Sequence, residues 1–259
     1  MNNFGMPTLI ELKTLQQQVD LCKQLGLDFV ELNMNLPEYS VANLAKIDYR
    51  NFAEQGVRFN IHAPEELDLA AFHDDIRNGF VKLVVNTLTA VPAGMIDIFN
   101  IHLNNGVHFK LPDKKIWLYD EYCDDFLRNL RQSIEVVLPV ACEKQIKICV
   151  ENTGNFSMAH IRKALELLLE YDDIFLTWDV GHDYSAGYPD TVIFEQHLDK
   201  IRHFHLHDAI GEKCHLEFFE GDIDLQKFLV LSAKLNCSAV IETKSVQALV
   251  NSVAKLATR

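Results

Sequence analysis

Long hydrophobic runs and paired cysteines are both lacking from this sequence of 259 residues. No run approaches the ~18 consecutive apolar residues of a membrane-spanning helix, and the first residues show neither the basic nor the apolar region of a secretory signal. The six cysteines contain no Cys-x-x-Cys motif, which fits reduced thiols in the cytoplasm. We therefore expect a cytoplasmic protein that does not enter a membrane.

Positive charge is also scarce. The sequence has 24 Lys+Arg residues against 37 Asp+Glu residues, which gives a formal net charge of -13. This balance provides no general cationic surface for nucleic acid or anionic lipid, although a local basic groove can exist on an acidic protein. The expected partner is therefore a small molecule. Nucleic acid is disfavoured, and a homo-oligomer is possible.

Segments with a period of two residues alternate with segments of helical period along the whole chain, which is typical of βα units. We count eight such units, and a chain of 259 residues lies within the size range of one (β/α)8 barrel. We therefore predict an α/β fold, a single TIM-barrel domain over residues 1–259. The predicted strands lie around residues 6–11, 29–35, 58–64, 96–103, 146–152, 174–179, 201–208 and 238–243.

The predicted helices lie between these strands. They cover residues 14–25, 41–55, 74–90, 119–143, 157–170, a short segment after 189, 225–235 and 246–257. Pro139 should interrupt or kink the fourth helix, and Ser157 should cap the fifth. Residues 104–117 form the longest predicted loop. Long loops on a tight barrel are often lids or binding loops, so Phe109, Lys110 and Trp117 are candidates for covering a substrate.

The stretch from Ile201 to Asp208 alternates imidazoles with apolar residues at the period of a strand. His203, His205 and His207 share one face. Phe204 and Leu206 lie on the other face, which should pack against helices. The imidazoles therefore line something else, and a metal site is the obvious candidate.

Other predicted strands also end in a carboxylate or a histidine. The carboxyl ends of all strands face one mouth in a barrel, so these side chains should converge there. A divalent cation would relieve the repulsion among three crowded carboxylates. The mixed nitrogen and oxygen donors suit Mn, Zn, Co or Mg, and we expect one divalent metal and no nucleotide cofactor. The strand-end residues are His62, His102, Glu151, Asp179, His205 and Glu242.

The remaining histidines have simpler explanations. His203 should lie deeper in the barrel as a neutral core imidazole, and His207 should lie at the rim. His73, His160 and His197 fall on predicted helices, where a surface position is the default.

Several segments, taken in order, resemble the xylose-isomerase-like TIM-barrel superfamily, which includes sugar isomerases, sugar epimerases and type IV apurinic endonucleases. They are Ile61-His-Ala-Pro64, Val150-Glu-Asn152, Trp178-Asp-Val-Gly-His182, Phe204-His-Leu-His-Asp208 and Val240-Ile-Glu-Thr243. The resemblance implies a divalent metal held by Glu151, Asp179, His205 and Glu242.

The resemblance also implies a mechanism, in which Glu151 and Glu242 transfer a proton through a metal-stabilised enediolate. By the same resemblance His182 contacts a substrate oxygen. His62, His102, His182 and His215 are expected to bind substrate or a second metal. Glu31, Trp117 and His207 are further candidates for substrate binding.

The endonuclease relatives use a three-zinc site, and this sequence matches much of it. The match breaks in the loop after the seventh strand, where Lys213-Cys-His215 replaces an expected Asp-x-His pair. The segment after His62-Ala-Pro64 is acidic, which disfavours DNA. The epimerase pattern departs as well, since Gly211 replaces a substrate-binding arginine. A carbohydrate isomerase or epimerase is therefore the main prediction, with a phosphodiesterase or apurinic-site endonuclease and a degenerate ligand-binding barrel as alternatives.

Overall fold

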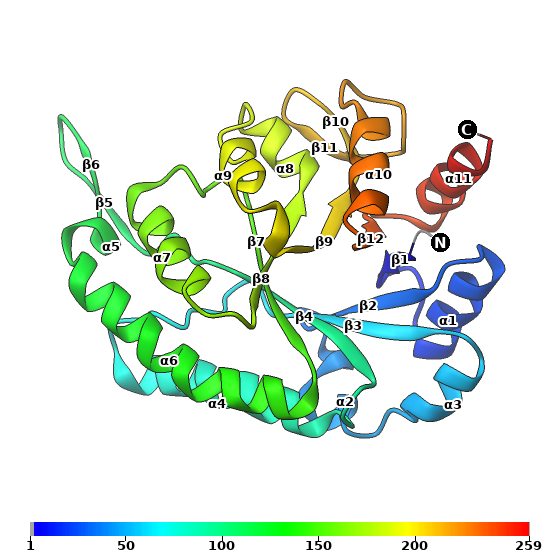
Figure 1. Ribbon diagram of the computed structural model, residues 1–259, viewed down its shortest axis with the longest axis horizontal. Helices are drawn as coiled ribbons and strands as arrows, with labels where there is room; N and C mark the ends of the chain where they lie inside the picture. The colour runs from blue at the N-terminus through cyan, green and yellow to red at the C-terminus, as the bar shows by residue number, and fades with distance from the viewer. Residues whose placement is uncertain (1–2, 259) are drawn as a thin grey trace.

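Eight short parallel strands pair edge to edge around a closed circle, and helices cover them from outside (Figure 1). The computed structural model describes residues 3–258. The circle closes where β1 pairs with β12, with Asn3 opposite Ser238. In order around the circle the strands are β1 (Asn3–Pro7), β12 (Ser238–Ile241), β9 (Ile201–Leu206), β8 (Ile174–Asp179), β7 (Lys147–Glu151), β4 (Ile96–His102), β3 (Arg58–His62) and β2 (Phe29–Asn33). The predicted single TIM barrel is confirmed.

Six longer helices pack on the outside of the barrel, and α4 and α6 lie side by side along one flank (Figure 1). They are α1 (Leu15–Gln24), α4 (Asp74–Ala90), α6 (Cys123–Lys144), α7 (Ala159–Leu169), α10 (Leu225–Lys234) and α11 (Val246–Ala257). The short helices are α2 (Val41–Leu44), α3 (Tyr49–Glu54), α5 (Leu118–Glu121), α8 (Val180–Ser185) and α9 (Thr191–Gln196), with 3-10 turns at Pro37–Tyr39 and Leu198–Lys200. Among residues 3–258, no helix has both the length and the apolar character needed to cross a bilayer.

The outward face of β9 packs against helices, as its sequence pattern predicts. Phe204 and Leu206 are fully buried. The Phe204 ring lies 6.1 Å from Trp178, and Trp178 stacks on Phe194 of α9 at 4.5 Å. This aromatic layer fixes the register of β9, and so directs the alternate residues of the strand into the barrel.

Several element boundaries differ from the prediction. The first strand ends at Pro7, because the segment after it turns: the Leu9 N–H donates to the Gln18 side chain instead of a neighbouring strand. The helix predicted over 41–55 is two short helices, α2 and α3.

The fourth and fifth helices also differ. The first turn of the fourth forms a separate helix, α5, and α6 runs unbroken through Pro139, with Val137 and Ala141 buried on either side of it. The predicted cap at Ser157 is wrong. The helix starts after Met158, which makes no side-chain capping bond.

The loop after β4 and the loop after β9 each contain a two-stranded hairpin. Residues 104–117 include β5 (His108–Lys110) paired with β6 (Lys115–Trp117), and the loop after β9 includes β10 (Asp208–Ile210) paired with β11 (Lys213–Leu216). His160 contradicts the expected surface position. It is fully buried, with its ring nitrogens 3.2 Å from Asp120 and from the Asn105 carbonyl.

Candidate metal centre and active site

A cavity of about 460 Å³ opens at the carboxyl end of the barrel. Its walls combine carboxylates, imidazoles and amides with apolar side chains, a composition suited to a small ligand with several polar groups. The lining residues are Pro7, Thr8, Leu9, Ile10, Glu31, Asn33, Asn35, Leu36, His62, Glu65, His102, Glu151, His182, His215, Glu242, Thr243 and Lys244.

Four side chains from adjacent strands meet beside this cavity, and we call them the four-residue cluster. Glu151 ends β7, Asp179 ends β8, His205 lies on β9, and Glu242 follows β12, where its N–H donates to the Leu206 carbonyl at 2.8 Å. One ligand atom from each lies within 4.8 Å of the others. Adjacent parallel strands with aligned carboxyl ends produce this convergence.

His205 is oriented by carboxylates on both of its ring nitrogens. Its Nδ1 lies 2.9 Å from Glu151 and 3.3 Å from Glu242, and its Nε2 lies 3.0 Å from Glu31. Burial disfavours the imidazolium, but Glu151, Glu31 and Glu242 outweigh burial and raise the pKa of His205 well above its usual value. Without a metal, the ring therefore carries a proton between these carboxylates.

Glu31 belongs to a second layer beneath the cluster. Its carboxylate lies between two imidazoles, 3.1 Å from His203 Nε2 and 3.0 Å from His205 Nε2. His203 Nδ1 contacts the Ser238 hydroxyl at 2.6 Å. Burial opposes the charge on Glu31, but His205 and His203 together hold the pKa of Glu31 below its usual value. The expected core position of His203 is confirmed by its complete burial.

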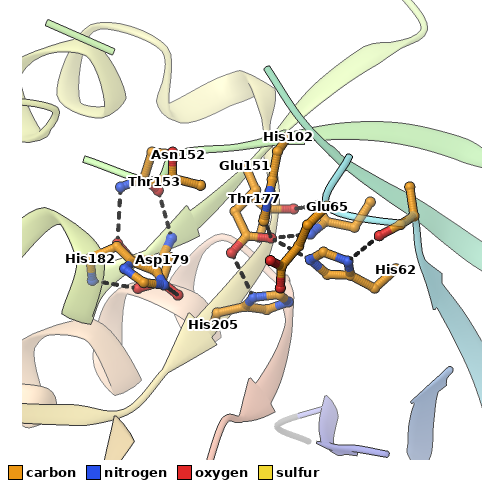
Figure 2. Close-up of polar contacts among 12 residues, drawn as sticks. His62, Glu65, His102, Glu151, Asn152, Thr153, Thr177, Asp179, His182 and His205 are labelled. Atoms are coloured by element: carbon orange, nitrogen blue, oxygen red, sulfur yellow. Dashed lines mark hydrogen bonds and ion pairs between the residues drawn. The ribbon is translucent and has the colours of Figure 1, made fainter. Parts of the chain in front are cut away.

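Glu151 connects the four-residue cluster to a second group. Its Oε2 lies 3.3 Å from Nε2 of both His62 and His102 (Figure 2). The same oxygen accepts a hydrogen bond from Asn100. Thr177 donates to Asn100 at 2.6 Å, which fixes the amide. Burial lowers and Glu151 raises the pKa of His62, with a net result of about 9.

Asp179 joins the barrel to the short helix α8. Its Oδ1 accepts the His182 N–H at 2.7 Å, and the side chain caps α8 (Figure 2). The same oxygen lies 3.2 Å from His207 Nε2. Asn152 holds the Asp179 backbone from both sides, with contacts of 2.8 and 3.1 Å.

His182, His207 and His215 form a three-histidine cluster on the other side of Asp179. Their ligand atoms lie within 4.8 Å of one another, and the His215 N–H donates to His207 Nδ1 at 2.9 Å. Gly181 makes room for this arrangement, since a Cβ there would lie 1.8 Å from the His207 ring.

The four-residue cluster fits a divalent metal. Among residues 3–258, Asp179 Oδ2 and Glu242 Oε2 are buried without a hydrogen-bond partner. Burial opposes the charge on Glu151 and Glu242, but His205 holds the pKa values of both well below the usual range, so both are ionised. Ionised carboxylates next to an imidazole match the ligands that Zn, Mn and Co accept.

Two residues near the site were not predicted from the sequence, and one predicted residue lies away from the cavity. Lys244 lines the cavity and donates to Glu242 at 2.7 Å; its place two residues after a strand-end glutamate was the available signal. Asn100 supports Glu151 from the middle of β4, and no motif marks it. Trp117 lies against His108 at the base of the β5–β6 hairpin and is not among the described residues that line the cavity.

The closed parallel barrel and the cluster of carboxylates and imidazoles at its mouth place this chain among the TIM-barrel proteins with a candidate metal centre. Within that class, residues 19–251 match the family described as xylose isomerase-like TIM barrel, and the chain belongs to this family.

The chain is also similar to individual proteins. It is 27% identical over 209 residues to the uncharacterized protein MJ1311 of Methanocaldococcus jannaschii, a match that covers 76% of this chain and 68% of that protein. The fold resembles a D-tagatose 3-epimerase-like protein (TM-score 0.79, 22% identity, 99% and 96% of the two chains) and the 3-keto-D-glucoside 4-epimerase YcjR of E. coli (TM-score 0.77, 16% identity, 100% of both chains). A third similar structure is an IolI protein with a bound zinc atom (TM-score 0.70, 16% identity, 99% and 96% of the two chains).

Proposed function

We propose that this protein is a divalent-metal-dependent isomerase or epimerase of a sugar or sugar derivative. The observation that carries the proposal is the convergence of Glu151, Asp179, His205 and Glu242 within 4.8 Å beside a cavity of about 460 Å³. Several proteins of similar fold are sugar epimerases, and one holds zinc, which supports this choice of chemistry.

Glu151, Asp179, His205 and Glu242 are the proposed metal ligands. A bound divalent metal would supply the positive charge that stabilises an enediolate while a proton is away from carbon. His205 would bind through Nδ1, because this nitrogen faces Glu151 and Glu242, while Nε2 lies 3.0 Å from the Glu31 carboxylate. A carboxylate behind a ligating imidazole fixes both its tautomer and its orientation.

Glu151 and Glu242 are the proposed proton-transfer groups. They approach the Nδ1 side of His205 from different strands, and both are ionised, so either can accept a proton from a substrate carbon. One carboxylate would remove the proton and later release it to solvent, and the other, after taking up a proton from solvent, would donate it to the carbon. Lys244 lies 2.7 Å from Glu242 and adds to the effect of His205, which holds the pKa of Glu242 low.

The histidines around the cavity have two possible roles that depend on what is bound. His62, His102, His182 and His215 line the cavity and can donate hydrogen bonds to sugar hydroxyls or hold a second metal. His207 and Trp117 remain candidates for substrate contact, although neither is among the described residues that line the cavity. His207 is fully buried, so the expected position at the rim is wrong.

Solvent deuterium exchange tests the proposal. The purified protein, loaded with Mn, Co, Zn or Mg, is incubated with a panel of ketoses and ketose phosphates in deuterium oxide, and NMR follows the carbon-bound positions. Deuterium should enter one position in a metal-dependent way. Glu151→Gln and Glu242→Gln should each reduce the rate by at least ~100-fold, whereas Glu54→Gln, at an exposed position on α3, should leave exchange nearly unchanged. No exchange with any substrate would refute the proposal.

A metal-dependent phosphodiesterase or apurinic-site endonuclease is the second candidate. It is favoured by ligand groups at the cavity in addition to the four-residue cluster, such as His62–His102–Glu151 and His182–His207–His215, since phosphoester chemistry commonly uses more than one metal. It is disfavoured by Glu65 in the cavity wall. Metal counting separates the two: one metal per chain supports the isomerase, and two or three together with nicking of abasic duplex DNA support the nuclease. A chain that binds no metal would be a degenerate ligand-binding barrel.

A further inference from the structure

The β5–β6 hairpin stands away from the barrel beside α5 (Figure 1). It presents apolar side chains to solvent, with Val107 63%, Phe109 58% and Leu111 45% exposed. A two-stranded hairpin is at best marginally stable in water by itself, and clustered exposed apolar residues usually mark a contact surface. The cavity lining contains none of the described residues 104–117, so this contact is not with the mouth of its own barrel.

The base of the hairpin is held firmly. The Leu118 N–H donates to the Val107 carbonyl at 2.9 Å, and Tyr119 stacks on Phe126 of α6 at 4.3 Å. Gly106, with φ of 74°, lies so close to Tyr119 that a Cβ would approach its ring to 2.5 Å. An arm anchored in this way is a fixed projection, which fits docking better than it fits a moving lid.

The tip of the hairpin is basic although the protein as a whole is acidic. Lys110, Lys114 and Lys115 surround a turn with one acid, Asp113, whereas the whole chain has a net charge of -13. Among residues 3–258 none of these three lysines forms an ion pair, and Lys115 lies over the Trp117 ring at 3.9 Å. The tip therefore combines apolar side chains with unneutralised positive charge.

A groove of complementary character lies beside the base of the same hairpin. It consists of two adjoining hollows of about 360 and 400 Å³ that share Phe72 and Leu118. Ile76 is 52% exposed on its wall and Tyr122 is 54% exposed. Its charged lining is acidic, with four carboxylates and one arginine: Glu66, Asp68, Asp74, Asp125 and Arg128. Asp74 pairs with Arg77 and Asp125 pairs with Arg128, so among the described residues Glu66 and Asp68 are the two groove carboxylates that form no ion pair.

We propose that the hairpin docks into this acidic groove on a second copy of the chain, so that the protein forms a two-fold symmetric dimer by reciprocal exchange of hairpin arms. Charge complementarity between the lysines of one copy and the carboxylates of the other argues for a second copy as the occupant. The arrangement gives a closed two-fold dimer, because the tip and the groove lie at opposite ends of the same hairpin arm. Two arms placed antiparallel put each tip at the base of the other, and the reach from Val107 to the turn is roughly 13 Å at ~3.3 Å per residue.

Sedimentation velocity of the full chain over about 1–100 µM tests this dimer. The wild type should sediment at about twice the chain mass of 29.6 kDa. Lys110→Glu with Lys114→Glu should raise the dissociation constant at least tenfold, and so should Glu66→Lys with Asp125→Lys in the groove. The chain with all four substitutions should dimerise again, because the charges are exchanged between tip and groove.

Matched controls separate this contact from general effects of charge. Lys46→Glu with Lys234→Glu makes the same charge change on distant surfaces and should leave the dimer intact. Phe109→Ser should weaken the dimer, and Val230→Ser, at another exposed apolar position, should not. Thermal unfolding of each variant checks that the barrel is folded. A monomeric wild type, a dimer insensitive to the hairpin variants, or failure of the four-substitution chain to recover would each overturn the proposal.

Discussion

Glu31→Gln tests whether the second layer beneath the proposed metal ligands controls metal affinity. Glu31 lies 3.0 Å from His205 Nε2 and 3.1 Å from His203 Nε2, and it is 4% exposed. Glutamine keeps the shape and one acceptor oxygen but removes the charge. His205 would then be a weaker and less firmly oriented ligand, so we expect the metal dissociation constant to rise by about 10- to 100-fold, or about 1.4–2.7 kcal/mol.

Competition with a chromophoric chelator, with zinc or manganese at constant pH, measures this change. Glu65→Gln is the matched control, because Glu65 also lines the cavity but bonds Asn35 at 3.3 Å and contacts no imidazole of the cluster. Its affinity should stay within about twofold of wild type. Wild-type affinity in Glu31→Gln would show that the carboxylate behind His205 does not orient a ligand.

Three other predictions concern protonation, space and packing. Metal affinity should rise from pH 6 to pH 9, because His205 has a raised pKa and must lose its proton before it binds the metal; a pH-independent dissociation constant by chelator competition would contradict this. The pKa of His62 is also raised, to about 9. Because the pKa of His62 is higher in the folded protein than in the unfolded chain, protonated His62 stabilises the metal-free fold. This contribution is complete below about pH 6.5 and is lost as the pH approaches 9, which urea unfolding at several pH values can measure. Gly181→Ala should displace His207 and cost about 1–3 kcal/mol with loss of metal binding, while Gly79→Ala, with open space around it, should be neutral or slightly stabilising in the same unfolding assay. Phe204→Ala should cost about 3–5 kcal/mol in urea unfolding, and a loss under 1 kcal/mol would refute its role in the aromatic layer.

The fold was predictable because strand period and strand ends are local properties. Alternation along residues 201–208 was enough to separate Phe204 and Leu206 from the imidazoles, and a barrel with aligned strands then brings Glu151 next to His205. The contact between Glu31 and His205 was not predictable in this way. It spans the barrel interior between β2 and β9, which are separated by β1 and β12. The contact therefore depends on the register of every strand pair between β2 and β9, which the local sequence does not give.

Other features depended on tertiary contacts that leave no local pattern. His160 sits on a helix with ordinary helical periodicity, and only the packing of α5 and the hairpin base over it explains its burial. The β5–β6 hairpin was hidden because its three-residue strands are too short to show a period of two.

The two carboxylate oxygens of Asp179 have different roles, and this links the proposed metal site to the stability of helix α8. One carboxylate oxygen caps α8, and the other is buried without a hydrogen-bond partner and would face a bound metal. A ligand on the second oxygen restrains the first, so occupation of the centre and persistence of the α8 helix are thermodynamically linked. The amides of residues 180–185 thus form a built-in reporter. Their hydrogen exchange should slow when metal is added, even with no substrate present.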